Sequence, residues 1–174
     1  MSIPFFTVGH STRSADEFLA LLTTHGVRQL ADVRTIPRSR RHPHFSGDAL
    51  AALLRQKGIE YQAFPGLGGL RRPRADSPNS AWKNASFRGY ADHMLTPEFD
   101  RAFEDLLVFG GSVPTAIMCA EALWWRCHRA LLSDALLLRG CEVLHIDSKG
   151  PARSHRLTEF ARNLEGRPVY PGLL

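Results

Sequence analysis

Two cysteines lie close together in the second half of the sequence, each beside residues that can exchange protons. Glu121 follows Cys119 after one residue, and His128 and Arg129 directly follow Cys127. Cys127 stands at the start of a predicted helix, where the helix dipole and a neighbouring cation favour a thiolate over a thiol. We therefore predict Cys127 as a candidate nucleophile, with Cys119 as the alternative nucleophile.

The side chains of Cys119, Glu121, Cys127 and His128 also contain the atoms that bind zinc or iron. Seven residues separate the two cysteines, which is not a usual zinc-finger spacing. We predict no cofactor, and a metal ion at these four residues remains an alternative. A further alternative is that the cysteines are small buried apolar side chains, which is what we expect of Cys141.

Two carboxylates and two histidines are candidates for proton transfer. Glu121 and Asp32 can act as general acids or bases if they are partly desolvated in a cleft. Asp32 can equally well form a structural ion pair with a nearby arginine. His10 and His128 can shuttle protons, although His10 can also serve as a structural hydrogen-bonding group.

The positive charge of the chain is concentrated in one segment. The formal net charge is +5, and ten basic but only three acidic residues lie between Arg34 and Lys83. This excess predicts an anionic partner, either a phosphate-bearing small molecule or a nucleic acid, and the alternative is a solvated basic face. The candidate substrate-binding residues are Ser11, Arg34, Arg38, Ser39, Arg41, Arg71, Arg72 and Arg129.

Strand and helix patterns alternate along the chain. Strands are expected at residues 5–8, 27–33, 59–64, 115–119 and 142–146, and helices at 14–26, 46–58, 87–94, 96–110, 126–139 and 155–164. The alternation predicts one α/β domain over residues 1–174, a three-layer arrangement with a mainly parallel five-stranded sheet and helices on both faces. Ligands bind such sheets at the carboxyl ends of the strands, where His10, Asp32, Cys119 and His145 fall.

A long basic loop occupies residues 65–84 and shows no apolar period. A segment of this length without secondary structure is usually a functional loop, and we favour a lid over a disordered insert. Gly66, Gly68 and Gly69 follow the third predicted strand. No helix begins directly behind them, so the pattern is not that of a dinucleotide-binding or P-loop motif.

The sequence contains no segment that would direct it to a membrane. The longest uninterrupted apolar run, Ala49–Leu54, has six residues, whereas a membrane helix needs about 20. The first residues lack the basic and long apolar regions of a secretory signal, and three cysteines do not suggest a disulfide framework. We therefore expect a cytoplasmic protein with reduced thiols and no membrane partner.

Three motifs occur in order along the chain. They are Val8-Gly9-His10-Ser11, then Asp32-Val33-Arg34 with Pro37 and Ser39 behind it, and finally the triplets Cys119-Ala120-Glu121 and Cys127-His128-Arg129. With these motifs the sequence resembles the bacterial and archaeal domain-of-unknown-function family 488. The resemblance implies a compact α/β domain and a site at the motif positions, but it implies no reaction.

Our leading hypothesis is an enzyme, a hydrolase or a transferase, that acts on an anionic phosphate-bearing substrate at the strand ends. The arginines would hold the anion, the carboxylates would transfer protons and a cysteine would be the nucleophile. One alternative is a non-catalytic nucleic-acid-binding module with a structural cysteine cluster. Another is a thiol redox or metal protein, which requires Cys119 and Cys127 to lie near each other.

Overall fold

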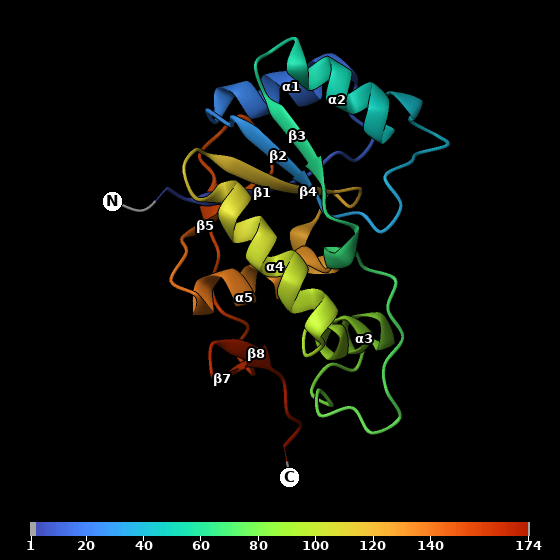
Figure 1. Ribbon diagram of the computed structural model, residues 1–174, viewed down its shortest axis with the longest axis vertical. Coiled ribbons are helices and arrows are strands. Elements are labelled where there is room, and N and C mark those ends of the chain that lie inside the picture. The colour runs from blue at the N-terminus through green and yellow to red at the C-terminus, as the bar shows by residue number, and fades with distance from the viewer. Residues whose placement is uncertain (1–2, 174) are drawn as a thin grey trace.

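The computed structural model describes residues 3–173, and a six-stranded sheet forms its centre (Figure 1). The strands are β1 (Phe5–Gly9), β2 (Gln29–Asp32), β3 (Glu60–Ala63), β4 (Thr115–Cys119), β5 (Val143–Ile146) and β6 (Arg153–Ser154). Their order across the sheet is β3-β2-β4-β1-β5-β6. Strands β1 to β5 are parallel, and β6 runs antiparallel to β5 at one edge.

This arrangement confirms the α/β class and the mainly parallel sheet. The sheet has six strands rather than the predicted five, because Arg153 and Ser154 pair with His145 and Leu144 of β5. Two residues are too few to carry a strand pattern, so β6 leaves no signal in the sequence. The carboxyl ends of β1 to β5 lie on the same edge of the sheet, as parallel strands require.

Helices cover both faces of the sheet. They are α1 (Ala15–Thr24), α2 (Gly47–Arg55), α3 (Ala85–His93), α4 (Pro97–Gly110) and α5 (Arg129–Leu138), with short 3-10 turns at Pro43–Phe45, Pro65–Leu67 and Trp124–Arg126. Helices α1 and α2 pack on the face that Phe6 and Val8 of β1 enter. Helices α3, α4 and α5 pack on the opposite face together with Phe5. Successive residues of β1 thus enter opposite cores, as expected of a strand that is buried on both sides.

Two predicted helix starts are confirmed at atomic detail. The Ser14 hydroxyl accepts the backbone N–H of Glu17, and the Glu17 carboxylate accepts the backbone N–H of Ser14, both at 3.1 Å. The Thr96 hydroxyl likewise accepts the backbone N–H of Phe99 at 3.2 Å. These contacts satisfy N–H groups that have no partner within the first turn of a helix. Within residues 3–173, no helix is long and apolar enough to cross a membrane.

The helix predicted over residues 155–164 is wrong. His155 is buried, and its backbone N–H bonds to the carbonyl of Val143 at 2.8 Å. Three residues later the backbone N–H of Thr158 donates to the carboxylate of Asp134 at 3.0 Å. These bonds to other elements hold the segment against the domain, and the backbone does not form its own helical bonds.

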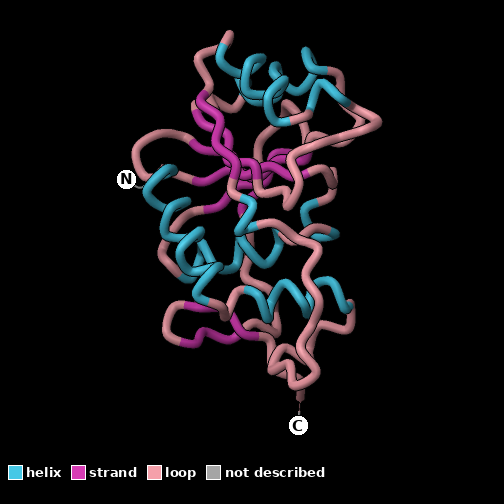
Figure 2. Tube along the Cα trace, turned by 45° about the vertical axis from the view of Figure 1, so that its right-hand side comes forward, coloured by secondary structure: helices cyan, strands magenta, loops and turns pink. Residues whose placement is uncertain are grey.

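The end of the same segment forms a hairpin instead of a helical turn. Strand β7 (Arg162–Leu164) pairs antiparallel with β8 (Arg167–Val169). The turn between them places Glu165 at φ +52° and Gly166 at φ +86°, the left-handed conformation that tight hairpin turns favour. In Figure 2 the hairpin lies apart from the main sheet, toward the C-terminal end of the molecule.

The long basic loop over residues 65–84 is attached to the body of the domain. The carboxylate of Asp92 on α3 accepts the Arg74 backbone N–H at 2.8 Å, the Ser77 hydroxyl at 2.6 Å and the Asn79 amide at 2.8 Å. Asn79 is completely buried, and its amide oxygen accepts the backbone N–H of Tyr170 at 2.9 Å. The middle of the loop therefore belongs to the packed interior, where it joins α3 to the C-terminal segment.

A chain of hydrogen bonds runs through the interior beside β1 and β5. The Asp134 carboxylate accepts Nε2–H of His155 at 2.8 Å and the hydroxyl of Tyr170 at 2.8 Å. His155 Nδ1 lies 2.9 Å from Nε2 of His145, whose Nδ1 lies 2.6 Å from the Thr7 hydroxyl. Because the carboxylate only accepts, the hydrogen bonds can all run in one direction, from the Thr7 hydroxyl through His145 and His155 to Asp134.

Two buried histidines make the stability of the fold sensitive to acid. Burial lowers the pKa of His145 from 6.5 to about 3 and that of His10 to about 4. Below pH 6.5 these two histidines therefore bind protons in the unfolded chain but remain neutral in the folded chain. The free energy of unfolding consequently decreases with decreasing pH. We expect the free energy of unfolding to fall by up to about 1.4 kcal/mol per pH unit for each histidine between pH 6.5 and about 4.

Urea unfolding at pH 7, 5.5 and 4.5 measures this slope. His145→Gln, which removes one titrating group, should have a lower stability at pH 7 and a shallower decrease below pH 6.5. His25→Gln, at the solvent-facing end of α1, is the control and should retain the wild-type slope. A wild-type stability that is constant over this range would contradict the prediction.

Candidate functional site

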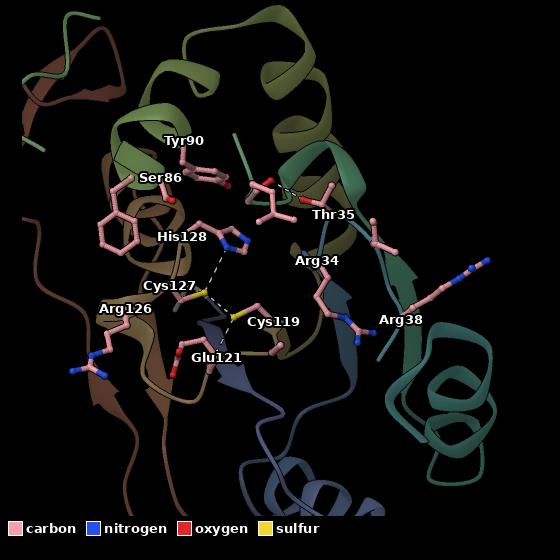
Figure 3. A pocket seen from close by; sticks show the side chains of 15 residues that line it. Arg34, Thr35, Arg38, Ser86, Tyr90, Cys119, Glu121, Arg126, Cys127 and His128 are labelled. Carbon is pink, nitrogen blue, oxygen red and sulfur yellow. Dashed lines mark hydrogen bonds between the residues drawn. The ribbon is translucent and has the colours of Figure 1, made fainter. Parts of the chain in front are cut away.

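A cavity of about 380 Å³ opens at the carboxyl edge of the sheet, beside the ends of β2 and β4 and the start of α5 (Figure 3). We call it the thiol cavity. It is lined by Arg34, Thr35, Ile36, Arg38, Gly69, Leu70, Ser86, Phe87, Tyr90, Cys119, Ala120, Glu121, Arg126, Cys127 and His128. Its volume lies within the range of small-molecule sites in proteins.

The two cysteines of the sequence motifs meet in this cavity. Cys119 ends β4, Cys127 precedes α5, and their sulfur atoms lie 2.7 Å apart as free thiols. Their residues are only 3% and 6% exposed, so the cavity is the route by which a reactant would reach the sulfurs. The eight-residue spacing brings the sulfurs together because the Trp124–Arg126 turn folds the chain back toward β4.

His128 is oriented toward the sulfur of Cys127. Its Nε2–H donates to the carbonyl of Val33 at 2.8 Å, which leaves Nδ1 facing the Cys127 sulfur at 3.5 Å. Gly69 lies against the same ring, since a Cβ at Gly69 would be 3.1 Å from Nδ1. The carbonyl fixes the tautomer and the glycine leaves room for the ring, so Nδ1 is held where it can exchange a proton with the thiol.

Arg129 is the largest fully buried side chain, and it has no acidic partner within ion-pair distance among the described residues. One guanidinium nitrogen donates to the backbone carbonyls of Glu121 and Ala122, and another donates to the Thr7 hydroxyl at 3.3 Å. Its Nε has no hydrogen-bond partner within residues 3–173. A buried cation without a carboxylate favours negative charge on nearby groups, and Cys127 is one of them.

The two thiols differ in acidity because their surroundings differ. Burial opposes ionisation of Cys127, but hydrogen bonds from Cys119 and His128 and the charges of His128 and Arg129 outweigh it, so the pKa of Cys127 lies well below its usual range. The backbone N–H of Arg129, at the start of α5, also points at this sulfur from 3.5 Å. Burial and the bond to the neighbouring sulfur raise the pKa of Cys119. Cys127 is therefore the more acidic thiol of the pair, and Cys119 is the less acidic one.

Asp32 and Arg34 form an ion pair at the edge of the thiol cavity. The Asp32 carboxylate accepts Nη2–H of Arg34 at 2.7 Å, Nε–H at 2.9 Å and the backbone N–H at 3.2 Å, and it also accepts the Tyr61 hydroxyl at 2.5 Å. These four bonds occupy the carboxylate, which does not line the cavity. Asp32 therefore positions Arg34, whose Nη1 lies 3.5 Å from Nε2 of His10.

A second cavity, also of about 380 Å³, adjoins the thiol cavity along Ala120 and Glu121. We call it the basic cavity. Its lining residues are His10, Ser11, Thr12, Ser39, Arg40, Arg41, His42, Ala120, Glu121 and Ala122. The predicted residues His10, Ser11, Ser39 and Arg41 thus lie beside the cysteines but in a separate hollow.

Three predicted substrate-binding residues line neither cavity. Arg129 is buried, and its guanidinium donates to backbone carbonyls and to the Thr7 hydroxyl. Arg71 donates to the carbonyls of Gly68 and Pro65 and lies 3.8 Å from Glu98, while Arg72 is exposed on the long loop. The predicted arginines of the basic segment therefore form two groups. One group lines the cavities, and the other belongs to the long loop, where Arg71 bonds to backbone carbonyls and Arg72 is exposed.

Several residues that line the thiol cavity were not among the predicted site residues. Tyr90 donates its hydroxyl to the carbonyl of Leu67 at 2.8 Å and faces the cavity, and Thr35 donates to the carbonyl of Gly69 at 2.7 Å. Gly68 approaches Thr35 so closely that a Cβ there would lie 2.4 Å from the Thr35 hydroxyl oxygen. The glycine run was a visible signal, but its reason is this close packing of backbone.

The described part of the chain contains no group of three or more histidine, cysteine, aspartate or glutamate side chains placed to hold a metal ion. Among the four residues considered for a metal, His128 uses Nε2 for the Val33 carbonyl, and Glu121 is exposed and accepts the backbone N–H of Leu123 at 3.1 Å. The chemistry that the arrangement offers is that of two adjacent thiols of unequal acidity, close to a histidine and several arginines.

The acidity of Cys127 can be measured through its alkylation. We expect iodoacetamide to modify Cys127 in preference to Cys119, with a rate whose pH midpoint lies well below that of an ordinary thiol, because only the thiolate reacts. His128→Gln keeps a donor for the Val33 carbonyl but removes the imidazole, and it should raise the midpoint by about one pH unit. Peptide mass spectrometry identifies the modified cysteine. An unchanged midpoint in His128→Gln would show that the imidazole does not stabilise the thiolate.

The comparisons with known proteins give one match. A family model described as "Domain of unknown function DUF488" matches residues 14–136, which include the Asp32-Val33-Arg34 motif and both cysteine triplets but not Val8–Ser11. Neither the curated proteins nor the solved structures match the chain. Because the matched segment spans well over half of the 174 residues, the chain belongs to the DUF488 family.

Proposed function

We propose that this protein is a dithiol enzyme that reduces a small anionic substrate, with Cys127 as the attacking thiolate and Cys119 as the resolving thiol. The observation that carries the proposal is the 2.7 Å separation of the two free sulfurs in a cavity open to small molecules. A cysteine hydrolase needs water as its second nucleophile. Here the second nucleophile beside Cys127 is a sulfur, which favours redox exchange over hydrolysis.

The first step uses the thiolate. The Cys127 sulfur attacks one sulfur of a substrate disulfide, the S–S bond of the substrate breaks, and the far half leaves as a thiolate. Cys127 and the near half of the substrate are then joined in a mixed disulfide. The same polarisation that favours ionisation of Cys127 makes its sulfur available for attack near neutral pH.

The second step uses the thiol. The Cys119 sulfur attacks the Cys127 sulfur, the bond from Cys127 to the substrate breaks, and the proton of Cys119 passes to the departing sulfur. The protein is left with a Cys119–Cys127 disulfide, having given two electrons to the substrate. Because the sulfurs already touch, this step requires little movement, and small distances favour it over dissociation of the mixed disulfide.

Three arginines support an anionic substrate. Arg34, Arg38 and Arg126 line the thiol cavity, and of these only Arg34 has a carboxylate partner among the described residues. Carboxylate and phosphate groups are the usual partners of arginine. The proposed substrate therefore carries a carboxylate or a phosphate group. We propose no resident metal or cofactor, and a cytoplasmic location suits thiols that must be reduced again after each cycle.

The basic loops give less support to a nucleic-acid-binding module. Arg71 and Arg74 interact with Glu98 and Asp76 at 3.8 Å and 2.8 Å, so part of the charge is already compensated within the chain. Arg38, Arg40, Arg41 and Arg126 line the two cavities, whereas the exposed Arg72 lies outside both. The thiol chemistry therefore accounts for more of the arrangement than phosphate-backbone binding does.

The proposal is tested with 5,5′-dithiobis(2-nitrobenzoate), an anionic aromatic disulfide, in a Cys141→Ser background. The reduced protein should release two equivalents of the coloured thiolate and finish with an internal disulfide. Cys119→Ser should release one equivalent and retain the adduct on Cys127, because the resolving thiol is missing. Cys127→Ser should react at least about 100-fold more slowly, since the remaining thiol is the less acidic one.

Mass spectrometry distinguishes the internal disulfide, which is two hydrogens lighter than the reduced protein, from a protein that carries adducts. The Cys141→Ser protein alone is the matched control, because Cys141 lies outside the thiol cavity. Retention of two adducts without an internal disulfide would overturn the proposal. Equal rates for the Cys127→Ser and Cys119→Ser proteins would overturn the assignment of the nucleophile.

A further inference from the structure

The basic cavity is unused by the chemistry proposed so far. It lies against the thiol cavity, and Ala120 and Glu121 belong to the lining of both. This shared wall directly follows Cys119 in the chain. A molecule with its sulfur at Cys127 can therefore extend past Glu121 into the basic cavity, provided that it is longer than a simple thiol.

The basic cavity offers several groups to an anion. Arg40 and Arg41 are exposed, and neither has a carboxylate within ion-pair distance in residues 3–173. The Ser39 hydroxyl oxygen accepts the backbone N–H of His42 at 3.0 Å, so its own proton is free to be donated. Two arginines and a hydroxyl donor on one wall are complementary to carboxylate groups.

Among the described residues, Glu121 supplies the one carboxylate in the lining of either cavity. One of its oxygens accepts the backbone N–H of Leu123 at 3.1 Å, and the other is not engaged by any described residue. A carboxylate among arginines favours a ligand that carries a positive group beside its negative ones. It attracts a ligand that carries an ammonium group a short distance from its carboxylates.

The depth of the sulfurs limits what can reduce them. Cys119 and Cys127 are 3% and 6% exposed at the inner end of a cavity of about 380 Å³. A folded protein that presents a dithiol on its surface is too broad to bring its sulfur to Cys127 without opening the cavity. A small thiol of a few linked amino-acid units can enter.

On the basis of the proposed dithiol function, we propose that the basic cavity binds a small zwitterionic thiol, an amino-acid or peptide thiol, that reduces the Cys119–Cys127 disulfide. Its thiolate attacks the Cys127 sulfur, the bond between the protein sulfurs breaks, and Cys119 leaves and takes a proton. A second molecule of the thiol attacks the mixed disulfide and releases Cys127 as a thiolate. Two thiols become one disulfide, and the protein regains two electrons.

Reduction of the oxidised full-length protein by reduced glutathione tests this assignment. Glutathione carries two carboxylates and an ammonium group, whereas dithiothreitol carries no charge. We expect Arg40→Ala/Arg41→Ala to slow reduction by glutathione about fivefold and to leave reduction by dithiothreitol unchanged. Salt at 0.5 M should slow the glutathione reaction of the wild type and have little effect on that of the variant, because salt screens the exposed charges.

The matched control is Arg28→Ala/Arg156→Ala, which removes the same charge from the other end of the molecule. Arg28 directly precedes β2 and Arg156 directly follows His155, which pairs with the first residue of β5, so both lie at the amino ends of strands. The control should match the wild type with both reductants. Equal slowing in both double variants would assign the effect to net charge alone and would overturn the site.

The outcomes separate this inference from the function on which it rests. If no Cys119–Cys127 disulfide forms, or if dithiothreitol does not reduce it, the dithiol function fails. If the disulfide forms and dithiothreitol reduces it, while glutathione acts at the same rate on the wild type and on Arg40→Ala/Arg41→Ala, the dithiol function stands and the zwitterionic-thiol site is refuted.

Discussion

The burial of Arg129 without an acidic partner constrains the whole site. A guanidinium group is charged at every physiological pH, and its removal from water costs several kcal/mol unless other groups replace the hydration. Here the replacement comes from carbonyls of the turn behind β4 and from the hydroxyl of Thr7 on β1. The side chain therefore joins the start of α5 to the two central strands, and its uncompensated positive charge helps to lower the pKa of Cys127.

The need to hydrogen-bond the buried guanidinium of Arg129 connects several other features of the site. The turn that follows Cys119 must direct its carbonyls at Arg129, and Gly9 permits this because a Cβ there would lie 1.9 Å from the carbonyl oxygen of Glu121. Thr7 can accept from Arg129 because its own proton is directed to His145, at the end of the buried chain that reaches Asp134. Thr7 thus links the buried hydrogen-bond chain to the arginine whose charge lowers the pKa of Cys127.

Most helices and strands could be predicted from patterns within a few residues. The arrangement of the site depends on contacts between residues that are distant in the sequence. The Ser14 and Thr96 caps and the apolar strands were readable because each is a pattern within a few residues. The last predicted helix failed because His155 and Thr158 bond to distant elements, which overrides local preference. Gly166, which adopts φ +86° in the hairpin turn, did not correct the assignment, because a glycine also commonly follows the last residue of a helix.

Among the site residues, the cysteines and His128 were found from their types, but their mutual contact depends on the turn at Trp124–Arg126. Arg129 was expected to bind substrate because arginine usually does. Its burial could not be foreseen, since Arg126 three residues earlier lies in the same motif region and is exposed. The division of the basic loops into two cavities and a packed segment likewise arises from long-range contacts such as those of Asp92 and Asn79.

Cys119 ends β4, which has a strand on either side, and Cys127 precedes α5, which is buried along most of its length. The connections after β2 and β3 supply exposed residues to the cavity linings, namely Ile36, Arg38, Arg40, Arg41 and Leu70. Reactivity and selectivity are therefore encoded in different segments of the chain. Exchange of those outer connections among proteins with this fold would redirect the same reactive pair to new molecules without rebuilding it, which makes the domain a suitable scaffold for diversification by loop replacement.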